Sequence, residues 1–315
     1  MDRGARVVER LKGPVATLPV CFTEDGEVHF SAMKKYVNWL CDQGVSTVLL
    51  TYGYSQFAWL SDEDIWRLTA DLAGVIAGRS VFIASTGWWP PKGCREFLKH
   101  ADAAGVDTVK VQINPWLIMP GGPDEKGAFF RKYFDAVQDA STIPLTLWCN
   151  YFGTPAVPVD VIAEMAKDPQ IVACKNDDHP FYYYYDLIRA TRDEDFAVIG
   201  GGQMRNFVFG YQVGSPAYLS AVVDFRPENA LEFYDLLVAG RLDDAWQWVY
   251  RYEEPCFKLW MPLKSHRWIH AVMEMHGLYP NRLPGAFDTP LTDEECARVR
   301  REMEEVYGPI EKIDL

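Results

Sequence analysis

The sequence has little of what marks nucleic-acid-binding and membrane proteins. Basic side chains are in deficit, with 31 Lys and Arg against 44 Asp and Glu and a formal net charge of −13. Nucleic acids and anionic lipid surfaces both recruit Lys and Arg, so the deficit argues against both. No uninterrupted apolar run approaches the roughly 18 residues that a transmembrane helix needs. We therefore expect no nucleic-acid partner and no membrane partner.

Paired cysteines and nucleotide-binding fingerprints are also missing. The 7 cysteines are widely scattered and form no CxxC pair, and such thiols are typically reduced and buried in a cytosolic protein. Charged residues occupy the start of the chain, where a signal peptide has an apolar core. Neither the Rossmann nor the P-loop pattern occurs. We expect a cytoplasmic protein that uses no cofactor and no metal.

Glycine and proline are too few for a low-complexity chain, at 23 and 20 of 315 residues. Apolar residues make up 49% of the chain and charged residues 24%, which is typical of a folded globular domain. A (β/α)8 barrel takes about 250 residues. The chain therefore has room for one such barrel and an extension.

Short β-rich runs recur along the chain, separated by segments with helical periodicity. Several of them, such as STVLLT and SVFIAS, are apolar nearly throughout, as expected for strands covered on both faces. Strands that alternate with helices predict a parallel sheet. Eight such units favour a closed barrel over the alternative, an open doubly wound sheet. The expected strands are Val15–Cys21, Ser46–Thr51, Ser80–Ser85, Asp107–Ile113, Ile143–Cys149, Gln170–Lys175, Phe196–Gly200 and Ala217–Val223.

From Pro227 onward the sequence has helical periodicity only. Pro227 suits a first helical turn, and Thr292 suits an N-cap because acidic residues follow it. We therefore expect an α/β fold, a (β/α)8 TIM barrel with a C-terminal extension of about three helices. Residues 1–315 would form a single domain, with a barrel core over 12–226 and helices over 227–315.

Lys175 is the first candidate for catalysis. It ends the run IVACK, and alternation puts its side chain on the same strand face as Ala173. Active sites of such barrels lie at the carboxyl ends of the strands. Apolar surroundings would disfavour the charged ammonium, and a neutral amine is the nucleophile that forms a Schiff base with a carbonyl. The alternative is a lysine that reaches solvent or pairs with Asp177 or Asp178.

Other strand exits carry polar groups and flexible turns that can bind a substrate. Tyr54 and Tyr151 are candidates for proton transfer. The glycine-rich turn after the seventh strand has backbone amides that can hold a carboxylate, a plain tight turn being the alternative. The expected substrate-binding residues are Gly53, Ser55, Gln56, Asn150, Gly201, Gly202 and Ser220.

Several longer strings resemble the dihydrodipicolinate synthase and N-acetylneuraminate lyase superfamily of lysine-dependent class I lyases. The resemblance covers about residues 12 to 310 and rests on GPVATLPVCFTEDGEVHF, GYSQFAWLSDED, the INP turn, Asn150, IVACK and SAVVDFRPENALEFYDLLVAGR. The last string is the most specific, because it is similar to the SxAxxNFxPExAxxFYxxLxxG pattern of the 5-dehydro-4-deoxyglucarate dehydratase branch. The resemblance implies a barrel with a helical extension, a homodimer or homotetramer, and a Schiff base between Lys175 and a 2-keto acid.

The resemblance is incomplete where family members hold and protonate their substrates. They have GTTGE or GTGE after the second strand, whereas here Tyr54 replaces a Thr, Ser55 a Gly and Gln56 the acid. The family's Tyr-Asn pair, whose Tyr shuttles protons, reads Cys149-Asn150. The Arg that follows this pair in synthases is absent. We therefore do not expect a true dihydrodipicolinate synthase.

Three functions remain open. The leading one is a hydro-lyase or aldolase that acts through Lys175 on a small 2-keto acid, sugar-derived or other. The second is a catalytically altered or inactive binding or regulatory paralogue on the same barrel. The third is an enzyme of another class, with a metal ion held by Asp177, Asp178 and His179.

Overall fold

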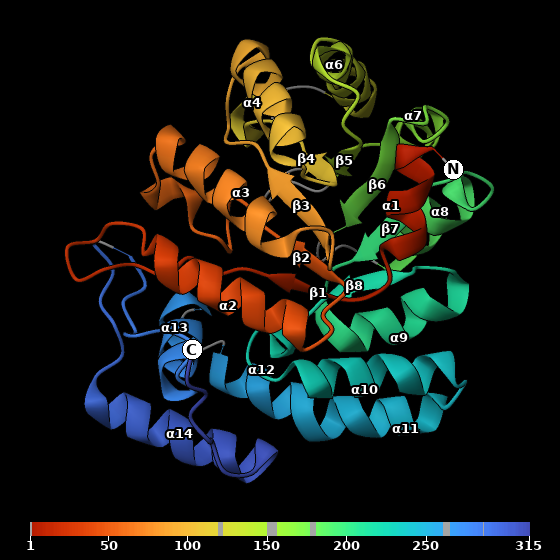
Figure 1. Cartoon of the computed structure of the whole chain (residues 1–315). Coiled ribbons are helices and arrows are strands. Elements are labelled where there is room, and N and C mark those ends of the chain that lie inside the picture. The colour runs from red at the N-terminus through yellow and green to blue at the C-terminus, as the bar shows by residue number, and fades with distance from the viewer. Residues whose placement is uncertain (1, 119–121, 150–155, 177–180, 261–264, 286) are drawn as a thin grey trace.

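Eight parallel strands close into a barrel, which confirms the predicted (β/α)8 architecture (Figure 1). In this computed structural model the described residues are 2–118, 122–149, 156–176, 181–260, 265–285 and 287–315. Each strand pairs with the next one along the chain, and β8 pairs with β1. Strands β1 to β8 are Gly13–Thr17, Thr47–Leu49, Val81–Ser85, Thr108–Lys110, Leu145–Trp148, Ile171–Asn176, Ala197–Gly200 and Ala217–Leu219.

The strands end earlier than their apolar runs suggest. The first ends at Thr17 rather than Cys21, the fourth at Lys110 rather than Ile113, and the eighth at Leu219 rather than Val223. After the eighth strand the chain turns at once into the short 3-10 helix η3 (Val222–Asp224). Residues beyond these ends therefore form the loops at the mouth of the barrel, where apolar residues pack under the surrounding helices.

Helices surround the barrel and begin where the sequence provides caps. Helix α3 shows this best, because the Ser61 hydroxyl accepts from the Asp64 amide while the Asp64 carboxylate accepts from the Ser61 amide. This capping box satisfies two donors that a helix start leaves open. The helices up to the eighth strand exit are α1 (Arg3–Arg10), α2 (Phe30–Asp42), α3 (Asp62–Ile76), α4 (Pro91–Ala104), α5 (Pro115–Ile118), α6 (Pro123–Asp135), α7 (Val159–Met165), α8 (Phe181–Thr191), α9 (Gln203–Val213) and α10 (Pro227–Val238), with short 3-10 turns η1 (Phe57–Trp59) and η2 (Gln138–Ala140).

The C-terminal extension is present and has more pieces than expected. From Pro227 on, the described residues form five α-helices rather than about three, because the π-helical turn η4 (Val249–Glu253) divides one long helical segment just before Pro255. Thr292 caps the last helix as predicted. Beyond α10 the helices are α11 (Leu242–Trp248), α12 (Glu254–Trp260), α13 (Ser265–Met275) and α14 (Asp293–Tyr307). None of the helices in the described ranges is both long and apolar enough to cross a bilayer.

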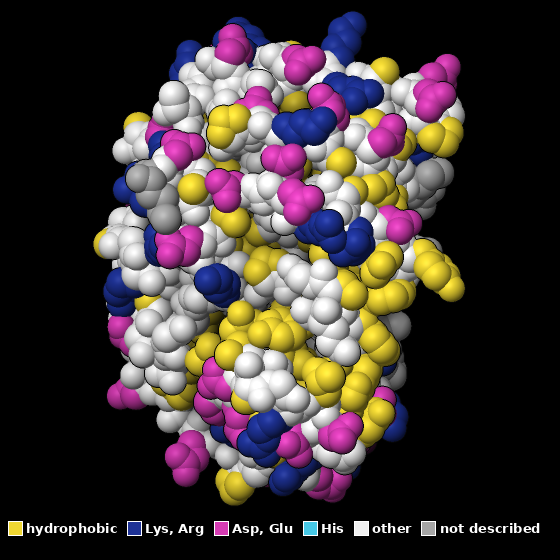
Figure 2. All heavy atoms as spheres, turned by 90° about the vertical axis from the view of Figure 1, so that its right-hand side faces the viewer, with side chains coloured by type: hydrophobic (Ala, Val, Ile, Leu, Met, Phe, Trp, Pro, Cys, Tyr) yellow, Lys and Arg dark blue, Asp and Glu magenta, His cyan; other side chains and the backbone are white. Residues whose placement is uncertain are grey.

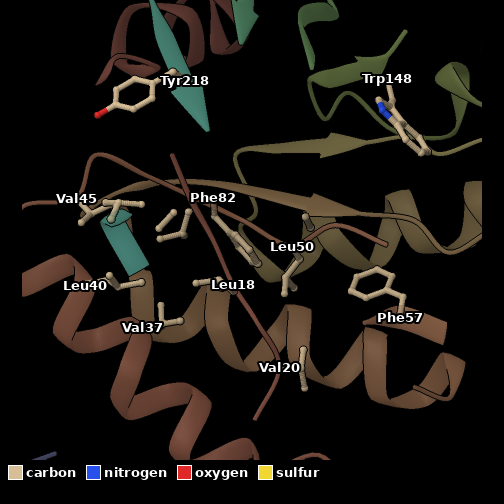
Figure 3. Packing of buried hydrophobic residues seen from close by; sticks show 14 of the residues in the cluster. Leu18, Val20, Val37, Leu40, Val45, Leu50, Phe57, Phe82, Trp148 and Tyr218 are labelled. Carbon is tan, nitrogen blue, oxygen red and sulfur yellow. The ribbon is translucent and has the colours of Figure 1, made fainter. Parts of the chain in front are cut away.

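Two apolar layers hold the barrel together. Inside it, side chains such as Val15, Ile83 and Ile199 pack together with Val7 and Leu11 from the segment of α1, which closes the amino-terminal end. Outside it, a larger cluster fills the space between strands and helices. Figure 3 shows part of this outer layer, where Val37 and Leu40 of α2 point toward Leu18 and Phe82 at the sheet. Burial of this apolar area is the main stabilising contribution to the fold.

Candidate active site

The inner face of the barrel changes from apolar to polar toward the carboxyl ends of the strands. The apolar lining consists of residues such as Val15, Leu49, Ile83, Ala173 and Ile199. Because side chains alternate with a period of two, the next inward positions on these and neighbouring strands carry the buried polar side chains Thr17, Thr51, Ser85, Lys110, Thr146 and Lys175. Active sites of (β/α)8 barrels lie at this end.

Lys175 lies on the inner face near the end of β6, where the alternation predicts it. Its neighbours across the sheet are Trp148 on β5 and Ile199 on β7. The residue is 7% exposed, so its amine lies close to the barrel mouth while its stem is enclosed. The Lys175 Nζ lies 5.8 Å from the centre of the Trp148 indole, within the range in which a cation and an aromatic ring attract each other.

A second lysine in the barrel interior was not identified from the sequence. Lys110 at the end of β4 has no exposed surface, and its Nζ lies 5.1 Å from the centre of the same Trp148 ring. The ammonium donates a hydrogen bond to the Thr51 hydroxyl. The signal was available, because Lys110 interrupts the apolar run TVKVQI at an inward position. A polar residue inside such a strand points to a functional interior.

Tyr54, a predicted catalytic residue, donates a hydrogen bond to a buried carboxyl group. Its hydroxyl lies 2.8 Å from Oδ2 of Asp224, which follows β8 and has no exposed surface. Burial raises the pKa of the Asp224 carboxyl well above its usual range, and the hydrogen bond from Tyr54 opposes that rise. Burial and the neighbouring Asp224 together raise the pKa of the Tyr54 phenol well above 10. The pair therefore connects the turn after β2 with the turn after β8.

Removing the Tyr54 hydroxyl should destabilise the protein measurably. Tyr54→Phe leaves the buried Asp224 carboxyl without this donor, and we expect a loss of about 1–3 kcal/mol in the free energy of unfolding. Denaturant titration measures it. Tyr52→Phe is the matched control, because the Tyr52 ring is half-buried and stacks on Trp88 at 3.8 Å. Equal stability of the two variants would show that the Tyr54 hydrogen bond contributes nothing.

Ser55 and Gln56, the two residues after Tyr54, use their backbone amides and side chains for hydrogen bonds within the protein. The Ser55 hydroxyl accepts from the Thr51 amide at 3.0 Å, and the Ser55 amide donates to the Thr51 carbonyl at 2.9 Å. Gln56 has a left-handed backbone, with φ of 57°, and its amide donates to the Gly53 carbonyl. Its side chain connects the turn to the C-terminal extension, since Nε2 donates to the Pro284 carbonyl and Oε1 lies 2.9 Å from His270 Nε2.

The glycine-rich turn after β7 is likewise occupied by internal bonds. The Gly201 amide donates to the Asn176 carbonyl at 2.5 Å, which extends the pairing of β6 and β7. Gly202, with φ of 71°, precedes α9. The first amides of this helix, of Met204 and Arg205, donate to the Glu253 carboxylate. An internal carboxylate therefore takes the place at this helix start where an anion would bind.

Glu253 is a buried acid that the sequence did not single out. It is 1% exposed and also pairs with the Arg205 guanidinium, at 3.0 Å. Burial raises the pKa of this carboxyl to about 7, while the backbone amides and Arg205 oppose the rise. Its position in the π-helical turn η4 aims it at the start of α9. The C-terminal extension thus supports the turn that contains Gly201 and Gly202.

The remaining expected residues lie on the eighth and fifth strand exits. The Ser220 hydroxyl accepts from the Val222 amide at 3.2 Å and is buried. Cys149 lies buried with its sulfur 3.3 Å from the Lys175 carbonyl. Asn150 and Tyr151 lie outside the described residues. The structure thus brings Cys149 to the backbone of the Lys175 strand.

No metal-binding cluster of three or more His, Cys, Asp or Glu side chains occurs within the described part of the chain. The expected alternative ligands Asp177, Asp178 and His179 lie outside that part.

The arrangement provides a primary amine among polar side chains at the mouth of a barrel whose deeper interior is apolar. Such an amine can attack a carbonyl carbon and form an imine with loss of water. A second lysine, Lys110, ends β4, and a buried acid, Asp224, follows β8. The site is therefore suited to covalent chemistry on an anionic carbonyl compound.

Known proteins share both the sequence pattern and the fold. The model of the dihydrodipicolinate synthetase family matches residues 10–305. A 4-hydroxy-tetrahydrodipicolinate synthase from Gluconacetobacter diazotrophicus is 26% identical over 238 residues, covering 74% of this chain and 77% of that protein. An N-acetylneuraminate lyase from Mediterraneibacter gnavus is 21% identical over 273 residues, covering 85% and 82%.

A solved structure has the same architecture. The crystal structure of dihydrodipicolinate synthase from Oceanobacillus iheyensis matches with a TM-score of 0.82 at 19% identity, covering 96% of this chain and 99% of that one. The family match extends over nearly the whole chain, from before β1 to the last helix. The chain therefore belongs to the dihydrodipicolinate synthetase family, whose members are Schiff-base-forming lyases.

Proposed function

We propose that the chain is a lyase in which Lys175 forms a Schiff base with a 2-keto acid, sugar-derived or other. The observation that carries this proposal is the position of Lys175 on the inner face of β6, 7% exposed and beside Ile199. A lysine amine in a largely desolvated site is the nucleophile that this chemistry requires. Lys175 also ends the string IVACK through which the chain resembles the family.

The proposed reaction needs one nucleophile, the Lys175 amine. The Lys175 nitrogen attacks the keto carbon, the carbonyl oxygen leaves as water, and a protonated imine remains. The imine withdraws electrons, so a base can remove a proton from the adjacent carbon, and a hydroxyl group on the next carbon leaves as water with a proton from an acid. In an aldolase a base removes the proton of that hydroxyl group instead, the bond between the two carbons breaks to release an aldehyde, and its electron pair forms an enamine. Tyr54 and Tyr151 are the proposed proton-transfer residues, and both reactions remain candidates.

We infer that the reaction is not the synthesis of dihydrodipicolinate. Cys149 occupies the place of the family's proton-shuttling Tyr, and its sulfur lies 3.3 Å from the Lys175 carbonyl. The amides of Ser55 and Gln56, in the turn where family members hold the substrate carboxylate, donate to the protein's own backbone. The same departures support the second candidate, a binding or regulatory paralogue that has lost turnover.

We also propose a homodimer or homotetramer. Figure 2 shows hydrophobic side chains gathered on one face of the molecule. A connected row of aromatic rings with exposed members runs over α8, α9, α11 and η4, and such rows favour association. Its members are Phe181, Phe209, Trp246 and Tyr250. Sedimentation velocity at neutral pH measures the assembly.

Turnover of a keto-acid panel tests the proposed activity. The purified protein is incubated with pyruvate-containing aldol adducts and with sugar-derived 2-keto acids that have a hydroxyl group on C4, and products are separated by liquid chromatography and mass spectrometry. We expect loss of water or release of pyruvate from at least one compound. A keto acid that raises the melting temperature but is returned unchanged would instead support the binding paralogue.

A further inference from the structure

The barrel interior has two ionisable side chains on its strands, and both are lysines. The ionisable residues of the eight strands are Lys110, Cys174, Lys175 and Tyr218. Cys174 and Tyr218 belong to the layer outside the sheet, where the Tyr218 hydroxyl donates to the Ala230 carbonyl at 2.9 Å. The two lysines come from β4 and β6, and side chains from alternate strands share a layer of a (β/α)8 barrel. Lys110 and Lys175 therefore place two amines at one level of the interior.

The Trp148 indole connects the two lysines. Its ring centre lies 5.1 Å from Lys110 Nζ and 5.8 Å from Lys175 Nζ. Thr51 accepts a hydrogen bond from Lys110 and so fixes that ammonium beneath the mouth. Lys110 has no exposed surface, and a buried charge is weakly screened by water. A carboxylate held near the Lys110 ammonium would therefore be attracted to it with little loss to screening.

Backbone donors that could otherwise bind a substrate carboxylate are already occupied. The Ser55 amide donates to the Thr51 carbonyl, and the Gly201 amide donates to the Asn176 carbonyl. At the start of α9, Glu253 accepts from the Met204 and Arg205 amides. Positive charge on a side chain is therefore the better means of attracting a carboxylate here than the turn amides.

We propose that Lys110 is a specificity-determining residue, whose ammonium attracts the carboxylate of the keto acid bound at Lys175. The inference rests on the Schiff base proposed above, and it adds the reason why that site takes an anionic carbonyl compound. The two amines lie 5.1 and 5.8 Å from the Trp148 ring centre, and burial of Lys110 preserves the strength of its field. A carbonyl compound without negative charge gains nothing from it.

The test compares pyruvate with methyl pyruvate, which has the same keto group and no negative charge. Wild type and Lys110→Met are incubated with increasing amounts of each compound and reduced with borohydride. Labelling is quantified by intact mass and located by peptide mapping. We expect Lys110→Met to raise the half-saturating pyruvate concentration roughly tenfold or more, since interactions with a charged group typically give such a factor. Methyl pyruvate should label both proteins alike, which also shows that the variant is folded.

Thr51→Val supplies an independent variant of similar volume. It removes the oxygen that holds the Lys110 ammonium. We therefore expect a smaller rise in the half-saturating concentration of pyruvate than in Lys110→Met, and no rise for methyl pyruvate. An equal loss with both compounds, no change with either, or an adduct on Lys110 would overturn the role of Lys110 while leaving Lys175 chemistry in place. A wild type that yields no adduct on Lys175 with either compound would overturn the proposed function itself.

Discussion

Replacing Lys175 with Met should abolish Schiff-base formation and lower turnover by more than about a thousandfold, because Lys110, the other lysine of the strands, has no exposed surface and is hydrogen-bonded to Thr51. Methionine keeps most of the apolar stem, which packs beside Ile199. The folded structure should therefore persist, with a melting temperature near that of the wild type. Steady-state turnover on the keto acid that reacts best measures the loss, and circular dichroism follows the fold.

Lys167→Met is the matched control for this substitution. Lys167 lies after α7, is exposed, and pairs with Glu164 at 2.6 Å. Exposed ion pairs contribute little, so turnover should match the wild type. Retained turnover in Lys175→Met would mean that the reaction does not proceed through this amine, and the function would then have to be carried by other residues at the strand ends.

Two buried histidines should make the protein acid-labile. Burial lowers the pKa of His270 from 6.5 to about 3, and it lowers the pKa of His276 from 6.5 to about 4. Both rings are neutral in the folded protein and take up a proton when it unfolds below pH 6.5. Their contribution to stability is therefore complete above pH 6.5 and is lost as the pH falls toward 4. We expect proton uptake by each histidine on unfolding to lower the free energy of unfolding by about 3 kcal/mol over that interval.

Urea titrations between pH 7.5 and 4.5 measure this loss. His270 lies 2.9 Å from Gln56 through Nε2, and the His276 Nδ1 donates to the Val272 carbonyl at 2.9 Å. His276→Gln and His270→Gln remove one titrating group each, so each variant should lose less stability on acidification than the wild type. Between pH 7.5 and 6.5 the three curves should run parallel. Parallel curves over the whole interval would contradict this origin of acid lability.

The architecture could be predicted because it depends on repeated local patterns. Eight apolar runs alternate with amphipathic helical segments. This alternation predicts eight strand–helix units, which is the number that closes a (β/α)8 barrel. The cap of α14 followed from Thr292 with acidic residues behind it. Strand ends were less predictable, since residues such as Ile113 and Val223 are as apolar as strand residues but pack against helices instead.

A site residue could be predicted only where alternation within a single strand sets the direction of its side chain. Lys175 faces inward because of alternation along β6, a local rule. The partners of Tyr54 and Gln56 are Asp224 and His270, which lie 170 and 214 positions away in sequence. No spacing pattern reports contacts between such distant segments. The role of the C-terminal extension in fixing the turns after β2 and β7 therefore became visible only in three dimensions.

Lys110 shows a different limit of sequence analysis. Its inward position follows from alternation as simply as that of Lys175, but it lies inside the predicted run Asp107–Ile113 rather than at the end of that run. Its relation to Lys175 depends on the Trp148 ring between them and on the closure of the barrel. The register of β4, β5 and β6 supplies that relation.

Borohydride reduction of the wild-type protein with pyruvate, followed by intact mass measurement and peptide mapping, tests the central claim most directly. The account predicts one adduct per chain, located on Lys175 and absent without keto acid or without borohydride. Longer 2-keto acids should compete with pyruvate for the same residue. A folded protein that gives no adduct with pyruvate or with any longer keto acid would contradict the claim that Lys175 is the Schiff-base lysine of this enzyme.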